Sequence, residues 1–231
     1  MIDFYMGDDL SARLRYEQVI PLARALSDPW AEMRVQRELS EVLRVQGAYA
    51  QADTLLTTVV TTARELGIVY EEILALATLV RLHCQLGDTG GAASWRDQLV
   101  QRMGGMGVTR DCQAEALRAC AVYALYRGDD QQALADAERA WEIAEQVDIP
   151  NFRADSAVIL GHARARMHQP DLAAAAYQQA VAWYITIGNA AMASEPQAGL
   201  VQLALAQGHR VRAQTLVEMI LPLLSERPAA L

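Results

Sequence analysis

Gly128-Asp129-Asp130-Gln131-Gln132-Ala133 is the stretch of this sequence that decides the fold. It places a glycine just after a helical segment, then acidic residues, then an alanine five positions after the glycine. A glycine in this place adopts the left-handed conformation that ends a helix. The same arrangement recurs about every 40 residues, in the pairs Gly7/Ala12, Gly47/Ala52, Gly87/Ala92, Gly128/Ala133, His168/Ala173 and Gly208/Ala213. We therefore predict a tight turn between two helices at each of these positions.

A second set of turn residues lies midway between the first. Its members follow an apolar residue and are also about 40 residues apart: Ser27, Gly67, Gly107, Asp148 and Gly188. Each unit therefore reads as helix, turn, helix, turn, and no segment shows the strict alternation of a half-buried strand. The expected helices are Leu10–Leu26, Trp30–Gln46, Tyr49–Leu66, Val69–Leu86, Gly90–Met103, Arg110–Arg127, Asp130–Val147, Asn151–Met167, Asp171–Ile187, Ala190–Gln207 and Arg210–Leu224. Pro196 falls early in one of them and predicts a fresh start at Ser194.

Composition excludes several classes of function. The 231 residues are 52% hydrophobic but only 6% aromatic, which favours closely packed helices over a sheet. The net charge of −8 argues against direct nucleic-acid binding and against binding to an anionic membrane. The N-terminus does not resemble a signal peptide, and no apolar run is long enough to span a bilayer. Three unpaired cysteines, Cys84, Cys112 and Cys120, favour a reducing, cytoplasmic location.

The segment from Ile159 to Ala180 resembles the tetratricopeptide repeat family. Leu160-Gly161, the alanine after the turn, the aromatic Tyr177 and the second alanine Ala180 stand at the spacing of that family, and Gly128–Ala140 is a second match. The unit is near 40 residues instead of the usual 34, and most first-helix aromatics are missing. The resemblance implies an all-α, right-handed superhelical solenoid of antiparallel helix pairs, with about five full pairs and a partial N-terminal one.

We expect a single domain over residues 1–231. Its units are 1–27 (partial), 28–67, 68–107, 108–148, 149–188 and 189–225, followed by a polar tail at 226–231. Met1–Met6 is expected to be the end of a first helix that starts upstream. Units of this length resemble the helical-repeat sensor regions of large bacterial regulators. That resemblance implies that the chain is a regulatory or sensor part of a longer signalling or transcription-regulatory protein.

The sequence contains no motif for catalysis. Phosphate-binding glycine loops, HExxH and nucleophile elbows are absent, and the glycines lie between helices instead of after strands. His83 and Cys84 are adjacent and point in different directions on a helix, so they do not form a metal pair. We predict that the chain is not an enzyme and that it uses no cofactor and no metal.

The candidate site is the concave surface, which the first helix of each pair lines in a solenoid. The inner positions of the family, carried over one repeat at a time, give Arg37, Glu41, Arg44, Arg81, Arg118, Val122, Tyr126, His162, Arg166 and Gln202. Five of these are arginines in an acidic protein, and arginine suits bidentate capture of carboxylates. One interpretation is a groove for an acidic peptide, a peptide C-terminus or another anionic ligand. The alternative is that the arginines pair with Glu41, Glu115 and Asp155 across neighbouring helices and only solvate the surface.

Two classes of function follow. The first is a module that binds a protein or peptide segment, or a small ligand, in the groove. The second is a structural module that self-associates as a homo-oligomer or packs on other domains of a parent chain. We predict no partnership with nucleic acid or membrane.

Overall fold

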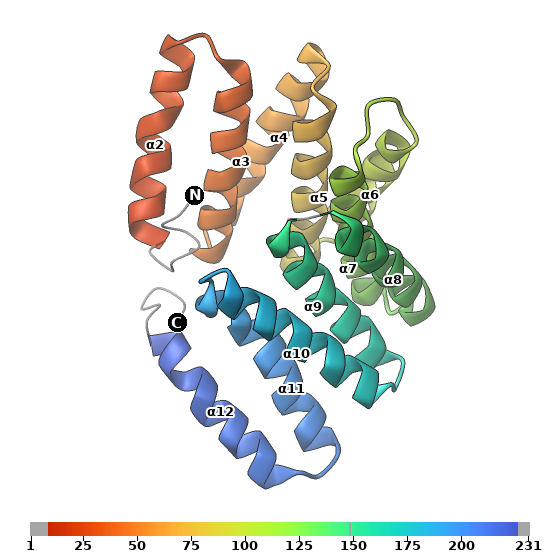
Figure 1. The fold of residues 1–231 in the computed structure, drawn as a ribbon. Helices are drawn as coiled ribbons and strands as arrows, with labels where there is room; N and C mark the ends of the chain where they lie inside the picture. The colour runs from red at the N-terminus through yellow and green to blue at the C-terminus, as the bar shows by residue number, and fades with distance from the viewer. Residues whose placement is uncertain (1–8, 148, 226–231) are drawn as a thin grey trace.

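The computed structural model describes residues 9–147 and 149–225. These residues form eleven α-helices and one short 3-10 helix, and they contain no β-strand (Figure 1). The elements are α2 (Asp9–Ala25), α3 (Pro29–Val45), α4 (Tyr49–Leu66), α5 (Val69–Leu86), α6 (Thr89–Met103), α7 (Arg110–Arg127), α8 (Asp130–Gln146), α9 (Pro150–Arg166), α10 (Pro170–Thr186), η1 (Ala190–Ala193), α11 (Ser194–Ala206) and α12 (Arg210–Ser225). The predicted all-α architecture is confirmed. Met1–Met6, the turn residues Gly7 and Asp148, and the tail 226–231 lie outside the described residues.

The helix boundaries lie close to those predicted. Three helices, α4, α5 and α7, have the predicted bounds, and the others differ by one residue at one end or at both ends. The segment Ala190–Gln207 is divided as Pro196 predicts, because η1 comes first and α11 starts at Ser194. Backbone N–H groups in the first turn of a helix have no partner within the helix, and proline has no N–H at all. A helix can therefore begin just before a proline.

The two turn registers are visible in the backbone. Within the described part of the chain, every residue with a positive φ occupies one of the predicted turn positions, namely Ser27, Gly47, Gly67, Gly87, Gly107, Gly128, His168, Gly188 and Gly208. Ser27 and His168 adopt φ values of 52° and 57° without the freedom of glycine. Each left-handed residue reverses the chain between two antiparallel helices.

The acidic residue after three of these turns caps the next helix. The carboxylates of Asp28, Asp88 and Asp129 accept hydrogen bonds from the backbone N–H three residues further on, at 3.0 to 3.1 Å. These N–H groups have no partner within the helix, so the cap satisfies a donor that would otherwise be free. A turn residue followed by aspartate therefore ends one helix and starts the next.

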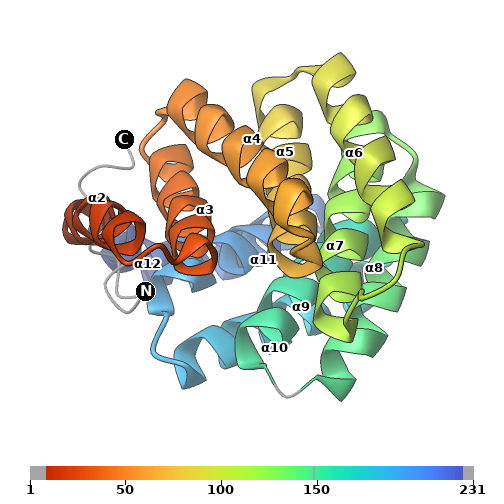
Figure 2. The same cartoon turned by 90° about the horizontal axis from the view of Figure 1, so that it is seen from above.

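Small and large side chains alternate at the helix contacts, as the sequence indicates. The alanines that follow the turns are almost fully buried, and so are the residues at the large first-helix position: Leu39, Leu79, Cys120, Leu160 and Leu200. Each inner second helix packs between two first helices. Seen from above, the stack curves, so that α2 and α12 lie on the same side of the molecule (Figure 2). The candidate residues lie on the helices α3, α5, α7, α9 and α11.

Candidate functional site

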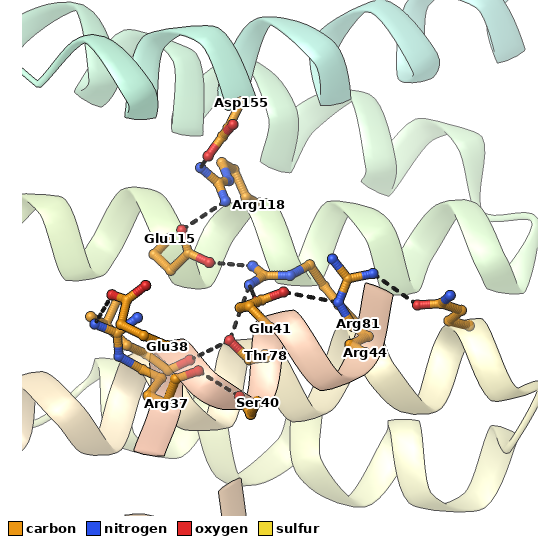
Figure 3. A network of polar contacts seen from close by, with 12 residues as sticks. Arg37, Glu38, Ser40, Glu41, Arg44, Thr78, Arg81, Glu115, Arg118 and Asp155 are labelled. Atoms are coloured by element: carbon orange, nitrogen blue, oxygen red, sulfur yellow. Dashed lines mark hydrogen bonds and ion pairs between the residues drawn. The ribbon is translucent and has the colours of Figure 1, made fainter. Parts of the chain in front are cut away.

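The ten candidate residues all lie on the first helices of the pairs. Arg37, Glu41 and Arg44 belong to α3, and Arg81 belongs to α5. The middle unit contributes Arg118, Val122 and Tyr126 from α7, and the remaining residues are His162 and Arg166 on α9 and Gln202 on α11. Arg81 and Arg118 contact carboxylates on neighbouring helices, whereas Arg44 contacts Glu41 on its own helix (Figure 3).

A continuous arginine–carboxylate ladder crosses four successive first helices. Its members alternate in charge and are Arg44, Glu41, Arg81, Glu115, Arg118 and Asp155. Arg44 Nε lies 2.9 Å from Glu41 Oε2, and the other oxygen of Glu41 lies 3.2 Å from Arg81 Nη2. Arg81 also pairs with Glu115 on α7. The ladder contains three positive and three negative groups, so its formal charges balance.

The far end of the ladder is anchored in the next pair of helices. Arg118 contacts Glu115 and Asp155 at 2.8 Å each, and the hydroxyl of Tyr184 on α10 donates to the second oxygen of Asp155 at 2.5 Å. The side chains of Glu115 and Arg118 are less than a tenth exposed. These charges can be buried because each has a partner of opposite charge.

The arrangement of the ladder favours the charged forms of Glu41 and Arg81. Burial alone raises the pKa of Glu41, but Arg44 and Arg81 outweigh it and hold the pKa at about 2. Burial also lowers the pKa of the Arg81 guanidinium, but Glu115 and Glu41 outweigh it and raise the pKa above its usual value. Both partners therefore remain ionised at neutral pH.

The predicted alternative, in which arginines pair with Glu41, Glu115 and Asp155 across neighbouring helices, is present in the structure. A further pair lies beside the ladder, where Arg37 Nε contacts Glu71 Oε2 at 2.9 Å. Glu71 is fully buried in α5 and was not among the candidate residues. The sequence contains a weak signal for it, because Glu71 lies just before the long apolar run Ile73–Ala77. Its place in the first turn, however, also suits the helix dipole, and that explanation needs no partner.

The C-terminal half of the surface is arranged around Tyr177. Its ring lies between Gly161 on α9 and Gly199 on α11, where an added Cβ on either glycine would overlap it. The Tyr177 hydroxyl lies 2.8 Å from His162 Nδ1, and the other ring nitrogen of His162 lies 3.1 Å from Glu195 Oε1. Because both glycines lack a side chain, the Tyr177 ring fits between them, and its hydroxyl contacts His162.

The pKa of Glu195 on α11 is lowered by residues of other helices. The hydrogen bond with His162 is the main cause that lowers the pKa of Glu195, and Arg44 and Arg118 lower it further. Arg44 belongs to α3 and Glu195 to α11, so the curve of the stack brings these two helices within electrostatic range.

The remaining candidates are not part of the ladder. Arg166 Nε contacts Asp130 at 3.0 Å and is more than half exposed. Val122 and Tyr126 are half-buried against the hydrophobic core, whereas Gln202 is exposed.

The described residues contain no group of three or more His, Cys, Asp or Glu side chains that could hold a metal ion. The three cysteines are buried and free. None of the described helices combines the length and the apolar composition needed to cross a membrane.

No protein-family model matches the sequence, and no curated protein matches it. Solved structures do resemble the fold. A Rap protein complexed with competence and sporulation factor superposes with a TM-score of 0.73 at 12% identity, over 94% of this chain and 65% of that one. BtubC from P. vanneervenii gives 0.62 at 16% identity, over 94% and 89% of the two chains.

A third similar structure is that of a larger protein. The STAND (signal transduction ATPase with numerous domains) protein with a tetratricopeptide repeat sensor from Pyrococcus horikoshii gives a TM-score of 0.62 at 14% identity. The superposition covers 99% of this chain and 36% of that protein. At these identities the likeness shows a fold, which is that of a tetratricopeptide-like helical solenoid.

Proposed function

We propose that this chain is a non-catalytic module that binds an acidic segment of another protein, or an acidic peptide, in its concave groove. The observation that supports the proposal is the arginine–carboxylate ladder along the inner helices. A charge row that is paired from one helix to the next fixes the side chains of the groove before a ligand arrives. Pre-organisation of this kind reduces the entropy lost on binding.

The ladder divides the predicted site into two kinds of residue. Arg81 and Arg118 are engaged by two carboxylates each, so they act as a framework for the groove. Arg44 and Arg166 are more exposed, and each contacts a single carboxylate. A guanidinium has five N–H donors, so these two can accept a ligand carboxylate beside the existing partner. We assign them the direct ligand contacts, with His162, Tyr126 and Gln202 along the same surface.

We further propose that the chain is a sensor part of a larger regulatory protein. The likeness to a STAND protein with a repeat sensor supports this role, and so does the likeness to a Rap protein that was solved with a bound factor. In both cases the superposition leaves part of the other protein uncovered, so the rest of a parent chain would supply the response.

The groove can be tested with a displayed library of random peptides. Peptides selected on the chain are expected to be enriched in Asp and Glu, and the double variant Arg44→Ala/Arg166→Ala should bind them at least about tenfold more weakly. Arg139→Ala serves as the control, because Arg139 is an exposed arginine on the second helix α8. Failure to select any peptide, or equal affinity for the double variant and the control, would refute the groove as the site.

A further inference from the structure

The ring of His83 on α5 lies between two carboxylates from different elements. Its Nδ1 lies 2.8 Å from Oδ2 of Asp88, the residue that caps α6, and its Nε2 lies 2.8 Å from Oδ1 of Asp53 on α4. The His83 side chain is 14% exposed, whereas those of Asp53 and Asp88 are 39% and 51% exposed. None of these three residues belongs to the arginine–carboxylate ladder.

One nitrogen of this ring has a second partner. The indole N–H of Trp95 on α6 donates to His83 Nε2 at 3.1 Å, and Nε2 is the same atom that faces Asp53. An indole N–H can only donate, and an ionised carboxylate can only accept. A ring nitrogen of histidine donates when it carries a proton and accepts when it does not. Nε2 can therefore bond to Asp53 or to Trp95, but not to both at once.

The other nitrogen has a single, well-supported partner. The Asp88 carboxylate also accepts from the backbone N–H of Gly91 at 3.0 Å. A Cβ on Gly91 would overlap both Asp88 Oδ2 and His83 Nδ1, so this glycine leaves room for the pair. The hydrogen bond from Gly91 and that with His83 lower the pKa of Asp88. Asp88 therefore remains an acceptor, and Nδ1 keeps a proton to donate to it.

We propose that His83 is a proton-controlled link between the helix pairs α3–α4 and α5–α6. When the ring is protonated, Nδ1 donates to Asp88 and Nε2 donates to Asp53, so one bond crosses from one pair of helices to the other. When the ring is neutral, Nδ1 still donates to Asp88 and Nε2 accepts from Trp95. Both bonds then lie within the pair α5–α6 and its connecting turn, and the link to α4 is released.

The surroundings of the ring select this form of the neutral histidine. A neutral ring with its proton on Nε2 would place an N–H against the N–H of Trp95 and a lone pair against the carboxylate of Asp88. A neutral ring with its proton on Nδ1 leaves only Asp53 without its bond, and the exposed carboxylate of Asp53 can be hydrated instead.

Other charged groups that neighbouring helices direct at α5 meet other residues. Their partners on α5 are Glu71, Glu72 and Arg81, and the groups themselves are Arg37 and Glu41 on α3, Arg64 on α4, Arg102 on α6 and Glu115 on α7. On α6, Arg96 pairs with Asp97. The carboxylates in contact with the ring of His83 are thus Asp53 and Asp88, one for each nitrogen.

Nitrogen NMR of the whole chain with labelled histidine tests the link. The shifts of the two imidazole nitrogens report whether the ring is protonated and which nitrogen carries the proton of the neutral form. Histidine side chains change charge in the range from about pH 5 to 8, so spectra are recorded from about pH 5.5 to 9. We expect His83 to be doubly protonated at the acidic end and to carry its proton on Nδ1 at the basic end. His83→Gln identifies its signals.

Two substitutions should move this transition in opposite directions. Asp53→Asn removes the charged acceptor of the protonated form, so the transition should move to lower pH. Trp95→Phe removes the donor of the neutral form and keeps an aromatic ring, so the transition should move to higher pH. Loss of one hydrogen bond should change the proton affinity at least about twofold in each case. Asp97→Asn, at an exposed aspartate that contacts Arg96, is the matched control and should leave the transition in place.

The native chain alone can overturn the proposal. A neutral His83 with its proton on Nε2 would contradict it, and so would a ring whose protonation does not change across this range of pH. Among the variants, shifts in the same direction for Asp53→Asn and Trp95→Phe, or no shift beyond that of the control, would show that Nε2 does not exchange one partner for the other. Circular dichroism shows whether each variant retains its helices.

Discussion

At the scale of single residues, the turns carry most of the information in this sequence. Gly128 has a φ of 75°, and a Cβ built on it would meet nothing within 4 Å. Glycine is therefore needed at this position only because of its backbone conformation. His168 occupies the equivalent turn with a φ of 57°, so it adopts the same conformation against the preference of an L-amino acid.

The two turns give a matched pair of substitutions. Gly128→Ala should lower the free energy of unfolding by about 1–2 kcal/mol, the usual cost of a left-handed L-residue. His168→Gly should raise it by up to about 1 kcal/mol, because relief of the strain exceeds the entropy cost of glycine. Urea unfolding of both variants measures the difference. Equal effects of the same sign would show that left-handed conformation does not decide these positions.

At the scale of helices, the ladder connects elements that the turns only separate. The pKa of Glu41 is about 2, below its ordinary value of 4.5, because Arg44 and Arg81 outweigh the effect of burial. A carboxylate whose pKa is lowered by folding stabilises the native state above its unfolded pKa. That contribution is lost as the pH falls from about 4.5 to about 2.

Acid titration of stability tests this linkage. The native chain should lose up to about 3 kcal/mol through Glu41 over that interval of pH. Glu41→Gln should be less stable at pH 7 and should show a shallower fall in stability between pH 4.5 and 2. Urea midpoints measured at several pH values provide the comparison. An identical pH profile in the variant would mean that Glu41 does not carry the charge assigned to it.

The helices were predictable because their signals are local. A glycine at a turn, an aspartate cap and an early proline each act within a few residues, and they place the ends of α5 and the start of α11 at Ser194. Which side chains pair in the ladder depends instead on the offset between neighbouring helices. The sequence indicates which face Arg81 occupies, but only packing determines that it reaches both Glu41 and Glu115. The buried Glu71 and the position of Tyr177 between two glycines were missed for the same reason.

At the scale of the whole molecule, burial is uneven along the stack. Most residues of α5 are buried on all sides of the helix, whereas α2 and α12 expose large apolar side chains at the two ends. In a solenoid each unit is stabilised by its neighbours, so the ends open before the centre. Hydrogen exchange should be slowest for the amides of α5 and much faster for those of α2 and α12. Uniform protection along the chain would show that the stack unfolds as one cooperative unit.

The ladder has a consequence for the modularity of the array. If the unit 68–107 were excised, α3 would stack on α7, and Glu41 would face Val122 in place of Arg81. Arg37 would face Cys112 in place of Glu71. The backbone register tolerates such an excision, but the charges do not, because each unit complements only the unit that now follows it. The repeats share one backbone shape but differ in their charged side chains. A change in their order would therefore separate buried charges from their partners.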